Sequence, residues 1–277
     1  MALIRKLLSA NISRLWRSKI FSFVLLTAAV MSGLLLLANQ FNSASSIKYM
    51  DFPFFSQFIY NPVILAAFIT LFLGTEYSDG TLRNKLSIGH SRGSVYAANL
   101  CASVILSVSF VVIQVLVCLG IGSLVFETFR MPTEYVAVAA ITACMTAIAS
   151  ASIFTAFAMN IQNKAVSIIG MVGMSFAVIL LVSMIAGVLY APEMVYEYTE
   201  KTVTGLTYGP LVPNPGYIRG TARTIAEWVN DILPQGQLYS LYAYDFDRYA
   251  RWPLTSAMVL VVSIVLGYYS FSKKDIK

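Results

Sequence analysis

Six long apolar runs alternate with segments that hold all of the charged residues of the chain. The runs cover residues 20–41, 58–74, 95–126, 135–159, 165–190 and 253–271. A helix needs roughly 20 residues to cross a hydrocarbon core about 30 Å thick. The second run is short, and we expect Pro62 in the first turn of its helix, where its missing amide would have no intrahelical partner anyway. The pattern predicts six membrane-spanning helices.

The composition supports this interpretation. The sequence is 58% hydrophobic and 12% charged, whereas soluble domains are about 45–50% apolar and about 25% charged. The expected fold is therefore an all-α integral membrane protein with a single transmembrane domain over residues 1–277. Its expected parts are an interfacial helix at 1–19, spans one to five within 20–190, a large helical loop at 191–252, and the last span with a tail at 253–277.

The N-terminal segment, residues 2–19, has apolar residues at helical spacing with cations between them. This is typical of an amphipathic helix that lies in the membrane interface, with its cations toward anionic headgroups. A secretory signal peptide is the alternative. We favour the uncleaved interfacial helix, because the basic region is long, the next apolar run has spanning length, and no clear small-residue cleavage site follows.

Basic residues favour one orientation of the spans. With the N-terminus inside, the 19 basic residues divide 12 inside to 7 outside, and the 13 acidic residues divide 3 to 10. An excess of lysine and arginine in short cytoplasmic loops sets membrane topology. We expect a multi-pass protein of the cytoplasmic (inner) membrane with both termini cytoplasmic. The net charge of +6 then reflects membrane orientation and contact with lipids, and we expect no nucleic-acid partner.

The segment 191–252 differs from the rest of the chain because it is rich in acids, prolines and aromatic residues. Residues 218–233 have an apolar stripe at helical spacing and predict an amphipathic helix that ends at Pro234. We expect an ordered cap outside the membrane. Two roles stay open for it: contact with a substrate, or packing against headgroups and the ends of the spans.

Small residues recur every four positions in the fourth run, which predicts a close helix–helix contact. They form two rows, Ala143, Ala147, Ala151 and Thr142, Thr146, Ser150. Packing within the chain is the simpler interpretation, and a subunit interface is the alternative. The link 160–164 is so short that spans four and five are expected to pack as an antiparallel pair.

Catalytic chemistry has no candidate residues in the sequence. None of the six apolar runs contains Asp, Glu, His, Lys or Arg, and ion-coupled carriers usually need such buried groups. Metal sites need clustered ligands, but the chain has one histidine, His90, and three cysteines that lie apart within the runs. No phosphate loop or nucleophile elbow occurs. We therefore expect no catalytic, cofactor or metal site in this chain.

Residues 75–93 form a charged island between the second and third apolar runs. Ser78 or Asp79 can cap the start of a short helix, and Gly89 suits its end. Leu82 and Leu86 are four residues apart and share one face of that helix. So short a helix buries little alone, so we expect its apolar face to meet either the bilayer surface or another protein.

The island resembles a segment of ABC transporter permeases of the type-2 exporter superfamily. In that family the pattern is roughly Glu-hydrophobic-x-x-Gly-Thr-Leu/Ile-Arg/Lys-x-x-Leu-x-x-Gly-x-x-Arg, directly after the second span. The matching residues within 74–92 are Glu76, Gly80, Thr81, Leu82, Arg83, Leu86, Gly89 and Arg92. The elbow helix, the six spans and the elements before the last span also resemble the family. The segment 191–252 is longer than the re-entrant hairpins of the family's polysaccharide and drug exporters.

The resemblance implies a permease that pairs with a second copy or a relative and carries two cytoplasmic ATPase subunits. ATP and Mg would bind those subunits, and this chain would hold no cofactor. Residues 76–92 would form the coupling helix. The implied ATPase contacts are Glu76, Tyr77, Asp79, Gly80, Thr81, Leu82, Arg83, Leu86, Gly89, His90 and Arg92.

The apolar spans favour export of a hydrophobic or amphipathic substrate, such as an antimicrobial peptide or an antibiotic. A membrane anchor or sensor subunit that binds a cytoplasmic partner without transport is the alternative. An intramembrane enzyme would need polar catalysts that the runs lack.

Overall fold

The computed structural model describes residues 2–42, 49–197, 199–202 and 205–275, and most of them are helical. The helices are α1 (Ala2–Arg17), α2 (Lys19–Asn42), α3 (Asp51–Ser56), α4 (Asn61–Ser78), α5 (Thr81–Ser87), α6 (Arg92–Val125), α7 (Thr133–Asn160), α8 (Lys164–Leu189), α9 (Gly220–Ile232), α10 (Pro234–Tyr242) and α11 (Trp252–Lys273).

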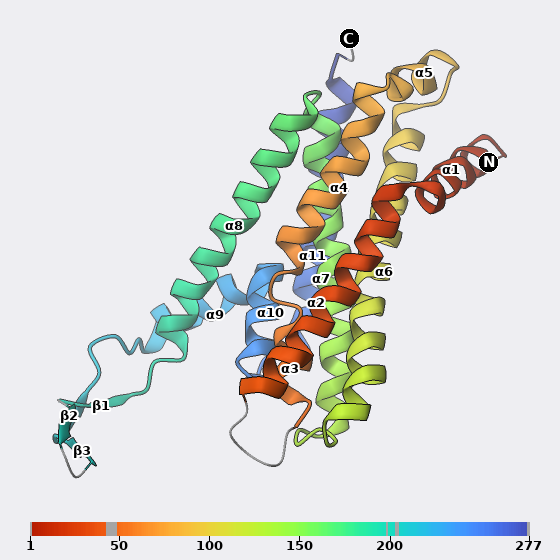
Figure 1. Cartoon of the computed structure of the whole chain (residues 1–277). Helices are drawn as coiled ribbons and strands as arrows, with labels where there is room; N and C mark the ends of the chain where they lie inside the picture. The colour runs from red at the N-terminus through yellow and green to blue at the C-terminus, as the bar shows by residue number, and fades with distance from the viewer. Residues whose placement is uncertain (1, 43–48, 198, 203–204, 276–277) are drawn as a thin grey trace.

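The prediction of six membrane-spanning segments is confirmed. Among the described residues, the helices long and apolar enough to cross a bilayer are α2, α3 with α4, α6, α7, α8, and α11 with the short turn before it. Pro62 lies in the first turn of α4, as expected. Figure 1 shows that both ends of the chain lie at the same end of the bundle as α5, which we call the α5 end.

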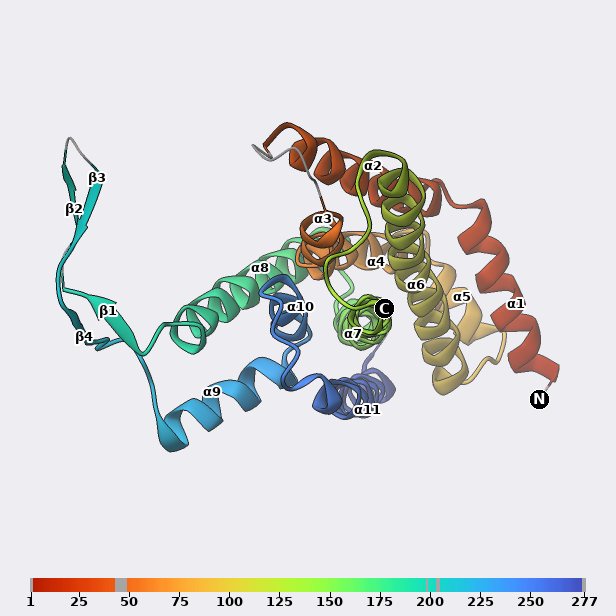
Figure 2. The same cartoon turned by 90° about the horizontal axis from the view of Figure 1, so that it is seen from below.

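Helix α7 lies at the centre of the bundle. It packs against α4, α6, α10 and α11, and α2 covers the outer side of α6. Figure 2 shows this arrangement along the bundle, with α1 crossing beside α6 at one edge and α8 extending away from the other edge.

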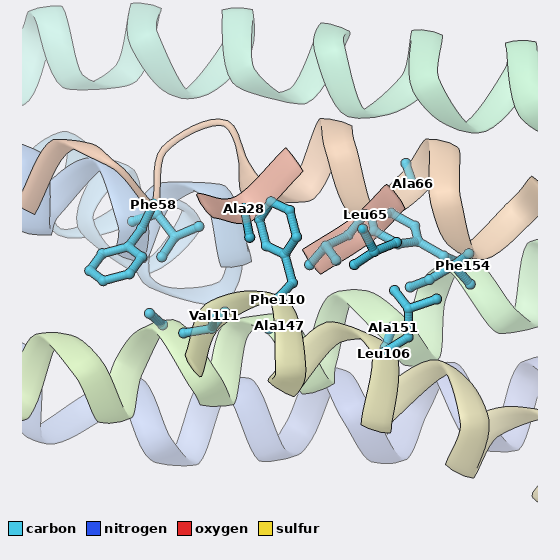
Figure 3. Close-up of a cluster of buried hydrophobic side chains, with 14 of the residues drawn as sticks. Ala28, Phe58, Leu65, Ala66, Leu106, Phe110, Val111, Ala147, Ala151 and Phe154 are labelled. Atoms are coloured by element: carbon cyan, nitrogen blue, oxygen red, sulfur yellow. The ribbon is translucent and has the colours of Figure 1, made fainter. Parts of the chain in front are cut away.

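The small-residue rows of α7 pack inside the chain, which confirms the simpler interpretation of that pattern. All six residues are buried. In Figure 3, Ala147 and Ala151 lie among Leu65 of α4 and Leu106 and Phe110 of α6. Small side chains let the helix backbones approach closely. The larger side chains of the neighbouring helices pack against them.

The expected close pairing of spans four and five is wrong. Helix α8 packs mainly along α4 and makes few contacts with α7, despite the short link between them. The close approach occurs at Gly74 of α4, where an added Cβ would lie 2.8 Å from Cγ of Lys164 at the start of α8. Gly74 therefore allows α8 to pack closely on α4, whereas the short link had led us to expect that α8 packs on α7.

The expectation of a wholly helical segment at 191–252 is also wrong for its first part. Strand β1 (Met194–Tyr196) pairs antiparallel with β4 (Leu211–Pro213), and β2 (Thr199–Thr202) pairs with β3 (Gly205–Tyr208). These strands form a narrow arm that projects from the bundle (Figures 1 and 2). The expected amphipathic helix is present as α9, and Pro234 begins α10.

Buried polar contacts fix α9 and α10 to the bundle. The carboxylate of Asp231, at the end of α9, accepts hydrogen bonds from Arg248 and from the indole of Trp252, both at 3.4 Å. Gln237 of α10 hydrogen bonds to Thr255 of α11 at 3.0 Å. Burial raises the pKa of Asp231, and the nearby Arg248 guanidinium opposes that shift.

Candidate functional site

The charged island folds into a tight turn followed by helix α5. The backbone of Gly80 is left-handed, with φ of 66°, and it precedes the first residue of α5. Gly89 is also left-handed, with φ of 97°. Residues other than glycine rarely adopt this backbone conformation. The helix end near Gly89 is confirmed, but the expected cap at Ser78 or Asp79 is wrong, because Gly80 stands at the N-cap of α5 and no side chain caps the helix.

Glu76 is the centre of the site. It lies in the last turn of α4 and is 1% exposed. Its Oε1 forms ion pairs with Arg14 of α1 and Lys85 of α5, and its Oε2 accepts a hydrogen bond from Nδ2 of Asn99 in α6 at 2.7 Å. One carboxylate therefore joins four helices: α1, α4, α5 and α6.

Asn11 of α1 closes the network. Its Nδ2 donates to Oδ1 of Asn99 at 2.7 Å, and its Oδ1 accepts from Nζ of Lys85 at 2.8 Å. Each side-chain amide thus uses its donor and its acceptor at once. We call Asn11, Arg14, Glu76, Lys85 and Asn99 the Glu76 network.

Two cations face one carboxylate in this network, so it holds an excess of positive charge. Burial lowers the pKa of the Lys85 ammonium, and Glu76 opposes that shift. The guanidinium of Arg14 lies 4.3 Å from the centroid of the Phe72 ring, a contact in which the ring attracts the cation. Removal of Glu76 would leave both cations without their counter-charge.

The apolar face of α5 packs against its own chain, which corrects the expectation of an external partner. Leu82 is 1% exposed and lies in a cluster with Leu7 of α1, Val95 of α6 and Phe271 of α11. Leu86 is half-buried against the same cluster. The apolar face of α5 therefore packs within this chain, and not on the bilayer surface or on another protein as expected.

Two further side chains join the island to α7 and α11. The hydroxyl of Tyr77 donates to the carbonyl of Met159, near the end of α7. The guanidinium of Arg92 donates to the carbonyl of Phe271 at 2.9 Å and to that of Lys274. The island therefore contacts α7 and α11 as well as α6 at this end of the bundle.

The opposite side of the island faces outward. Its exposed residues are Ser78, Asp79, Arg83, Asn84, Ser87, Ile88, Gly89 and Ser91. Ile88 is 79% exposed, which is unusual for a large apolar side chain next to so many polar ones. We call these eight residues the exposed face of the island.

The structure divides the sequence-predicted contact residues into two groups. Glu76 and Leu82 are buried and support α5 from within, whereas Asp79, Arg83 and Gly89 are exposed. The others, Tyr77, Gly80, Thr81, Leu86, His90 and Arg92, are partly buried. Contact of any of them with an ATPase stays a prediction.

The sequence analysis did not identify Arg14, Lys85 and Asn99 as partners of Glu76, nor Asn11 as the residue that joins Lys85 to Asn99. One signal was available: Asn11 falls in the apolar row of α1, between the buried Leu7 and Leu15. The apolar run 58–74 contains no carboxylate, but α4 continues beyond it to Ser78 and buries Glu76 in its last turn.

Comparison with known families decides what kind of protein carries this site. Residues 7–172, more than half of the chain, match the family model described as ABC-2 family transporter protein. The chain belongs to the ABC-2 transporter family. This ABC-2 protein is a multi-pass membrane permease with a role in transport, as its six apolar helices also indicate. No curated protein matches it significantly.

The match in this ABC-2 permease includes the whole Glu76 network and the exposed face of the island. It ends within α8, before the β arm, α9, α10 and α11. Among the described residues, no group of three or more His, Cys, Asp or Glu side chains is placed to hold a metal ion.

Proposed function

We propose that this chain is the permease of an ATP-driven exporter, and that the island is its contact with a cytoplasmic ATPase. Two permeases and two ATPase subunits would form the transporter, with ATP and Mg bound on the ATPases. The observation that carries this proposal is the Glu76 network, because it links an exposed helix to the membrane-spanning helices through buried charges.

Movement of α5 has a direct path to the spans. Lys85 joins α5 to Glu76 of α4, and Asn99 joins Glu76 to α6. Asn11 of α1 bonds to Lys85 and to Asn99. Leaving one member of such an ion pair without its partner costs about 2–3 kcal/mol, because Arg14 and Lys85 are partly exposed. When an ATPase moves α5, displacement of α4 and α6 together with it is favoured over rupture of the network.

The exposed face of the island is the surface that we assign to the ATPase. It offers the apolar Ile88 beside the charged Asp79 and Arg83. A central apolar side chain with a polar rim is typical of a protein interface. The island is then cytoplasmic, as the distribution of basic residues favours.

The substrate that we propose is hydrophobic or amphipathic, with antimicrobial peptides and antibiotics as the first classes to test. Away from the Glu76 network, several buried polar side chains inside the bundle are uncharged and pair with other side chains. For example, Asn61 of α4 and Gln114 of α6 exchange hydrogen bonds of 2.8 Å and 3.0 Å. Uncharged polar pairs of this kind favour an apolar substrate over an ion, because an ion needs charged or multiple polar ligands.

Reconstitution of the permease with its cognate ATPase tests the proposal. In proteoliposomes, the wild-type complex should hydrolyse ATP faster in the presence of its substrate and should move that substrate. Lys85→Met removes the link from α5 and leaves Glu76 paired with Arg14 and Asn99. This variant should retain its ATPase but lose substrate stimulation by roughly fivefold or more, the size of typical coupling between sites.

The matched control is Lys6→Met, which removes an exposed cation of α1 outside the network. It should behave as wild type. Substrate stimulation and transport by Lys85→Met at the wild-type level would contradict the transmission role. ATP hydrolysis by the wild-type complex without movement of any tested compound would contradict the export function.

A further inference from the structure

A groove separate from the exposed face of the island opens between the start of α6 and the end of α11. Its volume is about 440 Å³, and its walls include Gly93 and Ala97 of α6 and Ile264 and Val265 of α11. We propose that this groove binds an anionic phospholipid, with an acyl chain along these walls and the phosphate at the end of α11.

Gly93, the second residue of α6, leaves the groove open on that side because it has no side chain. An added Cβ on Gly93 would lie 3.5 Å from the ring of Tyr268, so a larger side chain would occupy the space next to that ring. The walls are aliphatic and aromatic, and Val265 is 58% exposed on the outer side of α11. In a membrane-spanning helix such a surface meets lipid chains.

The end of the groove has the chemistry of a headgroup site. Tyr268 and Tyr269 are 43% and 58% exposed, and tyrosines gather where a span meets the headgroups. The ammonium of exposed Lys273 contacts the Tyr269 hydroxyl and lies 4.2 Å from the centroid of its ring. An ammonium with a neighbouring hydroxyl donates charge-assisted hydrogen bonds that suit a phosphate.

The surroundings add positive charge. Arg92 lies at the start of α6, and Lys274 follows Lys273; both bind backbone carbonyls, so their charges are not paired with a carboxylate by these contacts. Asp275 is the nearest acid in sequence, and its carbonyl accepts from Gln162 in the α7–α8 link. The buried hydroxyl of Tyr96, which also borders the groove, has no hydrogen-bond partner among the described residues.

A phospholipid fits these observations better than a second copy of the chain. A protein covering the groove would remove Lys273 from water, which is costly unless a carboxylate pairs with it. A lipid phosphate in the interface neutralises the same cation without burying it. The proposal does not depend on the ATPase contact, because the groove and the exposed face of the island share no residue.

Lipid binding by the full-length permease in detergent tests the proposal. Native mass spectrometry would count bound phosphatidylglycerol and phosphatidylcholine during titration. The wild type should prefer phosphatidylglycerol. Lys273→Gln should weaken phosphatidylglycerol binding roughly fivefold, the effect of about one interfacial cation, and should change phosphatidylcholine binding little. Gly93→Leu should weaken binding of both lipids, because the leucine fills the groove.

Lys19→Gln is the matched control, since it removes an exposed cation at the start of α2, outside the groove. Phosphatidylglycerol with a photoactivatable acyl chain should label peptides from the start of α6 and the end of α11. Size-exclusion profiles confirm that each variant is folded. An equal loss for Lys19→Gln and Lys273→Gln, or labelling only elsewhere, would overturn the proposal. Wild-type binding by both groove variants would overturn it as well.

Discussion

Glu76→Ala tests the Glu76 network most sharply, because it removes the one carboxylate that four helices share. The variant leaves Arg14 and Lys85 facing each other without a counter-charge and leaves an amide donor of Asn99 unpaired. Apart from the carboxylate, the change removes only one methylene group, so little apolar packing is lost. Loss of stability is therefore expected to be electrostatic more than a matter of packing.

The magnitude follows from the exposure of the two cations. Removing one partner of a fully buried ion pair costs about 3–5 kcal/mol. Here the side chains of Arg14 and Lys85 are 31% and 17% exposed, so water partly replaces the lost interaction. We expect Glu76→Ala to lower the free energy of unfolding by about 2–3 kcal/mol.

Equilibrium unfolding in mixed micelles measures this change, with Arg17→Gln as the control. Arg17 lies on the same helix as Arg14 but is exposed, and surface substitutions of this kind change stability by about 0.5 kcal/mol or less. The double variant Glu76→Ala with Lys85→Met should recover part of the loss, because it removes an uncompensated cation. Two results would contradict this expectation. One is a Glu76→Ala variant that is no less stable than Arg17→Gln. The other is a double variant whose loss of unfolding free energy equals the sum of the losses in the two single variants.

Three further predictions concern the island and the membrane topology. Gly80→Val should destabilise the protein by about 1–2 kcal/mol, because a β-branched side chain must adopt a left-handed backbone there; thermal unfolding would show this, and Gly33→Val, in open space at an ordinary backbone conformation, should have a much smaller effect. Ile88→Asp should keep the wild-type fold but lose about 2 kcal/mol or more of ATPase affinity, whereas Leu82→Asp should unfold the chain; co-purification and size-exclusion profiles distinguish these outcomes. In a cysteine-free background, Thr221→Cys should react with an impermeant thiol reagent in intact cells and Ser87→Cys should not, and the reverse pattern would invert the topology.

The number and order of the spans could be predicted from the sequence because lipid imposes a simple requirement. Each span needs roughly 20 apolar residues, and the apolar runs lie within the spanning helices apart from one or two end residues. The small residues of α7 were also informative, since Ala143, Ala147 and Ala151 follow helical spacing. Both signals depend on local sequence alone.

Partners far apart in the chain could not be predicted in the same way. The pairing of α8 with α4 includes the close approach of Lys164 to Gly74, and no periodic pattern connects those two positions. The β arm was missed because its strands are only three or four residues long, too short for alternation of polar and apolar residues to become clear.

The sequence predicts which segment forms the candidate site but not which side chains contact one another there. The glycines at 80 and 89 and the short helix between them follow from turn chemistry, which acts locally. The direction of Leu82 could not be read from the island, because the cluster that buries it comes from Leu7, Val95 and Phe271. The partners of Glu76 likewise come from three other helices.

We propose that the exposed face of the island contacts an ATPase in the cytoplasm. A photo-crosslinking amino acid in place of Ile88, in cells that also express the cognate ATPase, tests it most directly. The control carries the same amino acid in place of Thr221, an exposed residue of α9. We expect a crosslink to the ATPase from position 88 and none from position 221. A crosslink from position 221, or none from position 88 while the complex still co-purifies, would contradict it.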